Sequence, residues 1–188
     1  MNSTGPEPIV VAVADEHDAA LRYAATESVR ERRPLRVVHA VPPPRGVVGP
    51  GAGGPETILV TYRAIELVAE DLLQQQYERA VKLVDGDVPV AKVLGRGPVI
   101  DVLLDQSEDA HRLVLQHRHG PRLSRILTGS TAAALAARAT VPVVSVPELW
   151  AGPRAVPHVT VALGGRDVEG GCDALLESAF AEAAARHA

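Results

Sequence analysis

Short apolar runs alternate with segments of helical composition along most of the chain, and this alternation limits what the chain can fold into. Residues 9–14, with the sequence Ile-Val-Val-Ala-Val-Ala, form the first run and show no alternation of polar and apolar residues. Such a run is typical of a strand that is buried on both faces. Strands that alternate with helices indicate βαβ units, right-handed crossovers and a parallel sheet. The sequence therefore predicts an α/β domain.

Five strands and four helices are expected in this domain. The strands are residues 9–14, 35–41, 89–94, 112–115 and 141–146, and the helices are residues 19–32, 57–84, 98–106 and 130–139. Residues 42–55 are too rich in Pro and Gly for regular structure, so we expect a loop before the long helix. The candidates for the buried face of that helix are Ile58, Ile65, Leu72 and Leu73.

The composition of the chain limits the classes of function. Hydrophobic residues make up 46% of the 188 residues but aromatic residues only 3%, so the core must be aliphatic. The formal net charge is −4 without a basic stripe, which argues against a dedicated nucleic-acid binder. Cys172 is the single cysteine, which excludes an internal disulfide and a cysteine zinc cluster. No apolar stretch is long enough for a membrane span and the start lacks the pattern of a secretion signal, so we expect a cytoplasmic protein without membrane contact.

The end of the chain repeats the character of its beginning. After a first domain of residues 1–148, residues 149–157 are interpreted as a linker. Residues 158–188 are then predicted to be a partial second repeat, with a strand at 159–163 and a helix at 173–186. A shift of 155 positions aligns Asp18, Ala19, Leu21, Ala24 and Glu27 with Asp173, Ala174, Leu176, Ala179 and Glu182. The matching order of strand and helix favours an internal duplication.

Several motifs resemble the universal stress protein family. They are the segment Leu113-Val114-Leu115-Gln116-His117-Arg118-His119-Gly120 with Gly129-Ser130-Thr131 further on, the opening strand followed by Asp15, and Val37-Val38-His39-Ala40. The resemblance covers about residues 8–147. It implies a Rossmann-like fold, similar to adenine nucleotide alpha hydrolases, with a five-stranded parallel sheet in the order 3-2-1-4-5 flanked by helices. It also implies a signalling or stress-response module, often a homodimer, that is not an enzyme.

The nucleotide motif of the family is met only in part. Family members that bind ATP carry Gly, two residues, Gly, nine residues and then Gly-Ser or Gly-Thr after the fourth strand. Here the spacing is kept, but Gln116 and His119 occupy the first two glycine positions, before Gly129-Ser130. The family's acidic residue at the end of the first strand falls on Ala14, with Asp15 one position later. The side chains of Gln116 and His119 can clash with a phosphate or donate hydrogen bonds to it.

The implied strand order places the ends of strands one and four at a switch point, where open α/β sheets bind ligands. Gly129-Ser130-Thr131 opens a helix, whose free N–H groups and dipole suit a phosphate. Asp15 can accept a hydrogen bond from an adenine amino group or a ribose hydroxyl, and backbone groups near Ala40 can flank the adenine. Arg118 and His119 belong to a basic segment that suits an anion. The expected ligand is ATP or a related nucleotide such as AMP, with Mg²⁺ only alongside the nucleotide.

Each of these residues also has a purely structural interpretation. Asp15 and Gly129-Ser130 can be loop or capping residues, the basic segment can be a solvated loop, and His39 in an apolar strand is interpreted as a satisfied core histidine. Three functions therefore stay open. The chain can be a ligand-sensing module that binds a nucleotide, or an interaction and dimerisation protein of the same fold that has lost nucleotide binding. A nucleotide hydrolase is the third, although no Ser-His-Asp, metal-ligand or P-loop pattern supports it.

Overall fold

The computed structural model describes residues 5–14, 18–43, 55–117, 131–152, 158–162 and 172–187. The strands are β1 (Ile9–Ala12), β2 (Leu35–Val41), β3 (Val90–Arg96), β4 (Arg112–His117) and β5 (Val143–Pro147). The helices are α1 (Ala19–Glu31), α2 (Pro55–Val84), α3 (Val99–Ser107), α5 (Thr131–Ala136) and α7 (Asp173–Arg186). These elements form two compact units, Met1–Trp150 and Ala151–Ala188.

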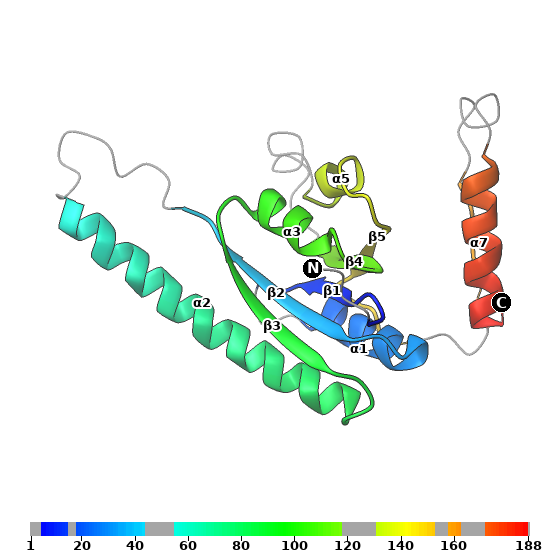
Figure 1. Ribbon diagram of the computed structural model, residues 1–188, viewed down its shortest axis with the longest axis horizontal. Coiled ribbons are helices and arrows are strands. Elements are labelled where there is room, and N and C mark those ends of the chain that lie inside the picture. Colours follow the sequence, from blue (N-terminus) through cyan, green and yellow to red (C-terminus); the bar gives the residue numbers. More distant parts are fainter. Residues whose placement is uncertain are drawn as a thin grey trace. The chain divides into compact units, whose positions relative to one another are not determined.

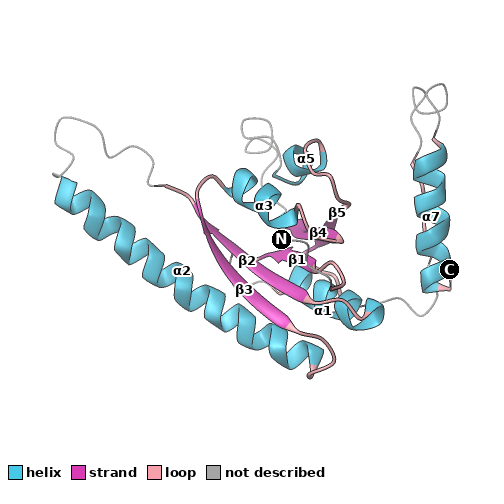
Figure 2. Ribbon diagram, in the orientation of Figure 1, coloured by secondary structure: helices cyan, strands magenta, loops and turns pink. Residues whose placement is uncertain are grey.

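The five strands of the first unit form one parallel sheet in the order β3-β2-β1-β4-β5, which confirms the expected fold (Figure 2). β1 lies at the centre, where Ile9 pairs with Leu35 of β2 on one side and with Arg112 of β4 on the other. The chain runs outward from β1 to β3 and then returns to β4 beside β1. The switch point of the sheet therefore lies between β1 and β4.

Two apolar layers sandwich the sheet, with α1 and α2 on one face and α3 and α5 on the other (Figure 1). Alternate residues of the central strands enter different layers: Val11 and Val37 pack under α1 and α2, whereas Val10 and Val38 pack under α3 and α5. All four side chains are fully buried. This explains why the first apolar run shows no alternation, since neither face of β1 meets solvent.

Helix α2 is much longer than the strands that it covers. Its 30 residues span about 45 Å at 1.5 Å per residue, whereas the 7 residues of β3 span about 23 Å. Arg96, the last residue of β3, lies beside Glu66, with 2.6 Å between Nε and Oε1. The part of α2 before Glu66 therefore runs beyond the end of the strand, as Figure 1 shows.

This overhang changes the expected buried face of α2. Among the described side chains of the helix, the buried ones are Ala69, Leu73, Gln76, Ala80 and Val84, all from the middle of the helix onward. The expectation is therefore correct for Leu73, which is 4% exposed, but wrong for Ile65, which is 40% exposed, while Leu72 is half-buried. Ile58 lies outside the side chains that the structure describes. Helical periodicity placed Ile65 on the apolar side of the helix. It could not show that the sheet beneath the helix ends near this residue.

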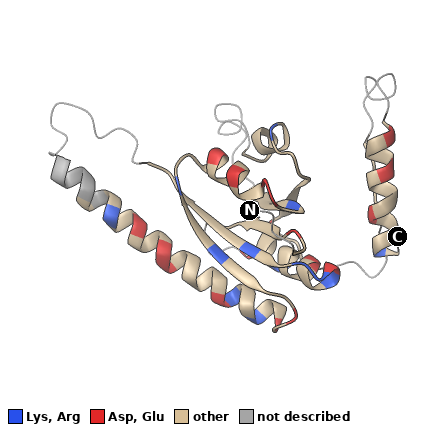
Figure 3. Ribbon diagram, viewed as in Figure 1, with Lys and Arg blue, Asp and Glu red and all other residues tan. Residues whose placement is uncertain are grey.

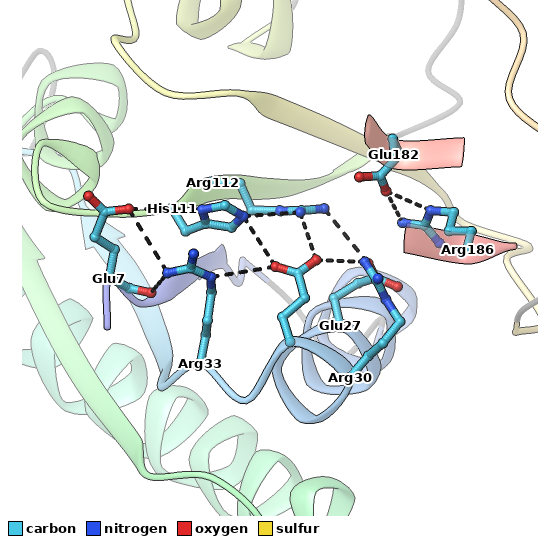
Figure 4. Close-up of polar contacts among 9 residues, drawn as sticks. Glu7, Glu27, Arg30, Arg33, His111, Arg112, Glu182 and Arg186 are labelled. Carbon is cyan, nitrogen blue, oxygen red and sulfur yellow. Dashed lines mark hydrogen bonds and ion pairs between the residues drawn. The ribbon is translucent and has the colours of Figure 1, made fainter. Parts of the chain in front are cut away.

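A cluster of charged residues joins α1 to the amino ends of β1 and β4 (Figure 4). Glu27 is only 2% exposed, and its carboxylate lies 2.6 Å from Arg30 Nη2 and 3.7 Å from Arg112 Nη1. Arg112 Nη2 also donates to Glu31 Oε1 at 2.7 Å. Because each buried charge has an opposite charge beside it, the cluster can lie at the edge of the core.

In the second unit, α7 has the range expected from the sequence. It ends at His187 in the left-handed conformation with φ 54°, and α1 ends at Arg32 in the same conformation with φ 54°. These two cap residues are 155 positions apart, which is the shift that aligns the two helices in sequence. The division into a domain, a linker and a partial repeat stays a prediction, to which this agreement adds support.

The expected strand at 159–163 is not observed in residues 158–162, which have no regular secondary structure. A strand needs a neighbour for its backbone hydrogen bonds, and the described part of the second unit offers none. No side chain of α7 is buried, whereas Ala19, Leu21 and Ala24 at the aligned positions of α1 are.

Candidate functional site

A pocket of about 180 Å³ opens between the carboxyl ends of β1 and β2 and the middle of α2. It is lined by Ala14, His39, Val41, Pro42, Ile65, Val68, Ala69 and Leu72. Most of these side chains are aliphatic, and His39 is the polar exception. The volume is smaller than the roughly 300–1,000 Å³ of pockets that bury a drug-sized ligand. The pocket therefore suits one planar ring system, with the rest of a ligand outside.

The orientation of His39 follows from the alternation of β2. His39 and Val41 point to the α2 face and line the pocket, whereas Ala40 between them packs against the layer under α3 and α5. His39 Nδ1 lies 2.7 Å from the carbonyl oxygen of Val13. A carbonyl oxygen only accepts, so Nδ1 carries the proton and donates it to Val13. In the neutral ring, Nε2 is then the hydrogen-bond acceptor.

Gln116 lies at the switch point, on the α1 face of β4. Its Oε1 accepts a hydrogen bond from the N–H of Ala20, in the first turn of α1, with 3.4 Å between the heavy atoms. This turn has no capping bond from the side chain of its N-cap residue, Asp18. The Gln116 amide oxygen therefore satisfies one of the free N–H groups at the start of α1, and the Nε2 group of the same amide is a hydrogen-bond donor.

The structure brings together only part of the site expected from the sequence. Ala14 lines the pocket, and Ala40 lies in β2 between two of its lining residues. Gln116 is at the end of β4 and Thr131 is the exposed first residue of α5. The remaining expected site residues, Asp15, Arg118, His119, Gly129 and Ser130, lie outside the described residues.

The sequence did not show that residues of α2 line the pocket, although this helix forms its main wall. The sequence places Leu72 among the candidates for the buried face of the long helix and does not single out Val68, and His39 is interpreted as a core histidine. That interpretation is correct for Nδ1, which Val13 satisfies, but it overlooked that the ring lines a pocket. The available signal was the position of His39 near the carboxyl end of β2, on the same face as Val41.

Two other kinds of site were sought in the described part of the chain. No group of three His, Cys, Asp or Glu side chains is placed to hold a metal ion there. Among the described helices, none combines the length and apolar character that crossing a bilayer requires.

The fold and the pocket define a class of protein: a doubly wound α/β domain with a pocket at the carboxyl edge of a parallel sheet. The sequence profile of the universal stress protein family matches residues 6–147, and the chain belongs to this family. The match covers the whole sheet and ends at the last residue of β5. Among curated proteins, no sequence matches the chain significantly.

Solved structures of universal stress proteins share the fold. UspA from Lactobacillus plantarum is 17% identical, with a TM-score of 0.60 over 77% of this chain and 99% of that chain. A universal stress protein from Archaeoglobus fulgidus is 25% identical, with a TM-score of 0.53 over 74% of this chain and 93% of that chain. A third, solved in complex with cAMP, is 17% identical, with a TM-score of 0.54 over 77% of this chain and 99% of that chain.

Proposed function

We propose that this universal stress protein is a signalling or stress-response module that binds an adenine nucleotide, with the base in the pocket beneath α2. The pocket carries the proposal, because it combines aliphatic walls with one ring acceptor at the carboxyl ends of parallel strands. One structure of the same fold holds cAMP. At 17% sequence identity this likeness supports the fold alone. We therefore infer the ligand from the chemistry of the pocket.

His39 gives a reason to prefer adenine. Its Nε2 accepts a hydrogen bond, and the exocyclic amino group of adenine donates one. Hypoxanthine and guanine carry a carbonyl oxygen at that position, which would set an acceptor against an acceptor. Ala14 also lines the pocket and directly precedes Asp15 in the chain. A nucleotide whose base fills the pocket would therefore have its ribose near the expected acidic residue.

Gln116 then decides how the rest of the nucleotide is held. Its Oε1 is occupied by the Ala20 N–H, so Nε2 is the group that can donate to a ribose or phosphate oxygen at the switch point. The side chain also fills space that a glycine would leave open. We propose binding without turnover. The homodimer and the cytoplasmic location expected from the sequence stay predictions, as does the use of Mg²⁺ with the nucleotide.

The test is isothermal titration of the full chain with AMP, ADP and ATP, with IMP as the matched ligand. We expect AMP to bind about fivefold more tightly than IMP, since one lost hydrogen bond is worth about 1 kcal/mol. His39→Asn keeps a donor for the Val13 carbonyl but removes the Nε2 acceptor, so it should reduce the preference for AMP. His158→Asn, at an exposed position of the second unit, is the control.

The alternative to nucleotide binding is an interaction protein of the same fold, which the altered glycine positions at Gln116 and His119 favour. Absence of heat with every nucleotide, together with an unchanged melting temperature, would reject the proposal, because a ligand of the native state must raise that temperature. Release of ADP from bound ATP would instead reject binding without turnover.

A further inference from the structure

The helix wall of the pocket continues onto exposed apolar surface. Ile65 and Val68 line the pocket from α2, yet they are 40% and 71% exposed. Ala64, which is also exposed, precedes Val68 by four residues and therefore adjoins it on the surface of the helix. We call Ala64, Ile65 and Val68 the α2 rim. The apolar lining thus extends from the pocket past its mouth.

The charged residues of α2 that neighbour the rim in sequence lie on the other side of the helix. Figure 3 shows that both signs of charge occur along α2. At 100° per residue, Arg63, Glu66 and Glu70 lie about 140–160° around the helix from Val68. Glu66 contacts Arg96 of β3 there, with 2.6 Å between Nε and Oε1. These charges are therefore directed away from a ligand that lies on the rim.

Toward the carboxyl end of α2, the rim meets a polar pair. Gln75 Nε2 donates to Asp71 Oδ2 at 2.8 Å, and both side chains are exposed. Asp71 follows Val68 by three residues and lies about 60° from it around the helix. An apolar group on the rim therefore has room for a short chain before it reaches these polar side chains.

The pocket offers one side-chain acceptor to an amino group that has two hydrogens. The acceptor is Nε2 of His39, because Nδ1 donates to the carbonyl oxygen of Val13. The other side chains that line the pocket are aliphatic, so the second N–H of an adenine amino group has no side-chain partner among them. An unpaired donor beside apolar side chains costs free energy, whereas an alkyl group in place of that hydrogen gains from the same contacts.

The order of the strands directs this amino group toward α2. Ala14 follows β1, and the proposed nucleotide has its ribose on this side, near Asp15. His39 lies in β2, the next strand of the sheet, and α2 packs over β2 and β3 (Figure 1). Adenine carries its ribose and its amino group at opposite ends. A substituent on the amino group therefore points toward the α2 rim.

We propose that the preferred ligand is an adenine nucleotide whose exocyclic amino group carries a short branched aliphatic substituent. This inference rests on the proposed function and specifies the class of nucleotide that the same pocket takes. The remaining N–H donates to His39 Nε2, and the substituent covers Ile65 and Val68. These two residues are three positions apart, so their Cβ atoms lie roughly 5–6 Å from each other. A group of the size of isopentenyl spans that distance.

The experiment is isothermal titration of the full chain with AMP and with isopentenyl-AMP, substituted on the exocyclic nitrogen. We expect the substituted nucleotide to bind about tenfold more tightly, which corresponds to the burial of roughly two methylene groups. Val68→Ser should reduce this ratio of affinities to about threefold or less. Leu67→Ser is the matched control, because Leu67 is 67% exposed but does not line the pocket. It should keep the tenfold ratio.

A second pair of ligands tests the bond to His39. AMP with one methyl group on the exocyclic nitrogen keeps an N–H, whereas AMP with two methyl groups there has none. The dimethyl compound should therefore bind about fivefold more weakly than the monomethyl compound, as expected for one lost hydrogen bond. Equal affinities would show that the amino group does not face His39 and would overturn the orientation on which the inference depends.

The outcomes separate this inference from the proposed function. If AMP binds but isopentenyl-AMP binds no more tightly, the substituent has no place on the α2 rim, and this inference is overturned while the proposed function stands. The same conclusion follows if Val68→Ser keeps the tenfold ratio. If none of these nucleotides binds, both fail. Far-UV circular dichroism and the melting temperature check that each variant folds.

Discussion

Gln116 at the end of β4 and Ala20 in the first turn of α1 are joined by a hydrogen bond, with 3.4 Å between Oε1 and the backbone nitrogen. The contact spans the switch point of the sheet, from the strand after the crossover to the helix after β1. In the family motif the residue at this place is a glycine, so here a side chain occupies what would be open space. The departure from the motif thus has a structural role at the start of α1.

Gln116→Gly should therefore change nucleotide affinity more than stability. The hydrogen bond is long and hence weak, so we expect a loss of only about 1 kcal/mol in the free energy of unfolding, mainly from the flexibility of glycine in a strand. ATP should bind more tightly, because a phosphate can approach the backbone. Titration calorimetry and urea unfolding measure the two effects. Gln116→Ala, which retains Cβ, should improve ATP binding less; equal affinities for wild type and both variants would contradict this role.

Gly95 in β3 is required by Val102 of α3. A Cβ placed on Gly95 would collide with Cγ1 of Val102 and lie 3.2 Å from its Cγ2. Val102 is 8% exposed and its β-branched side chain has little freedom to move. We expect Gly95→Ala to lower the free energy of unfolding by about 1–3 kcal/mol. In a Val102→Ala background, Gly95→Ala should lower the free energy of unfolding by at least about 1 kcal/mol less than in wild type. Equal costs in both backgrounds would show that this contact is not the cause.

Glu27 should be one of the most sensitive charged positions, because it is almost fully buried between Arg30 and Arg112. Glu27→Gln leaves Arg112, itself 9% exposed, with less compensating charge. We expect a loss of about 3 kcal/mol in the free energy of unfolding, measured by chemical denaturation. Asp105→Asn, an exposed change of the same kind in α3, should stay within about 0.5 kcal/mol of wild type. Comparable small effects at both positions would show that the cluster in Figure 4 is not important for stability.

His111, at the amino edge of the sheet, should make stability depend on pH. Burial first, and then the positive charges of Arg33 and Arg112, lower its pKa below the ordinary value, although Glu31 and Glu7 act in the opposite direction. The unfolded chain then binds the proton more readily than the folded chain, so stability rises with pH. We expect the free energy of unfolding to fall as the pH decreases through about 6.5 and to level off below the folded pKa.

The measurement is urea unfolding of wild type and His111→Gln between pH 8 and pH 5, a window set by about 6.5 as the unfolded pKa. The variant should show a smaller decrease over this range, while His158→Gln should behave as wild type. A decrease of the same size in His111→Gln would assign the pH dependence to other groups.

The sequence determined the fold because short unpatterned apolar runs between helices admit few alternatives to a parallel sheet. It located α1, β2 and α7 to within a residue, since their patterns are set by local spacing and their own caps. The strand order followed from the family resemblance, and the structure confirms it. The family motif identified Ala14 and Gln116 as candidate site residues, and the structure places Ala14 two residues after β1 and Gln116 next to the last residue of β4.

Only the tertiary structure decided the rest. Helical periodicity in α2 continues past the end of the sheet, so the sequence could not show that Ile65 is exposed or that Leu67 points away from the core. The partnership of His39 with Val13 and its place in a pocket wall depend on two strands that are distant in sequence. A residue's local pattern sets its secondary structure, but what lies opposite its side chain is fixed by packing between elements.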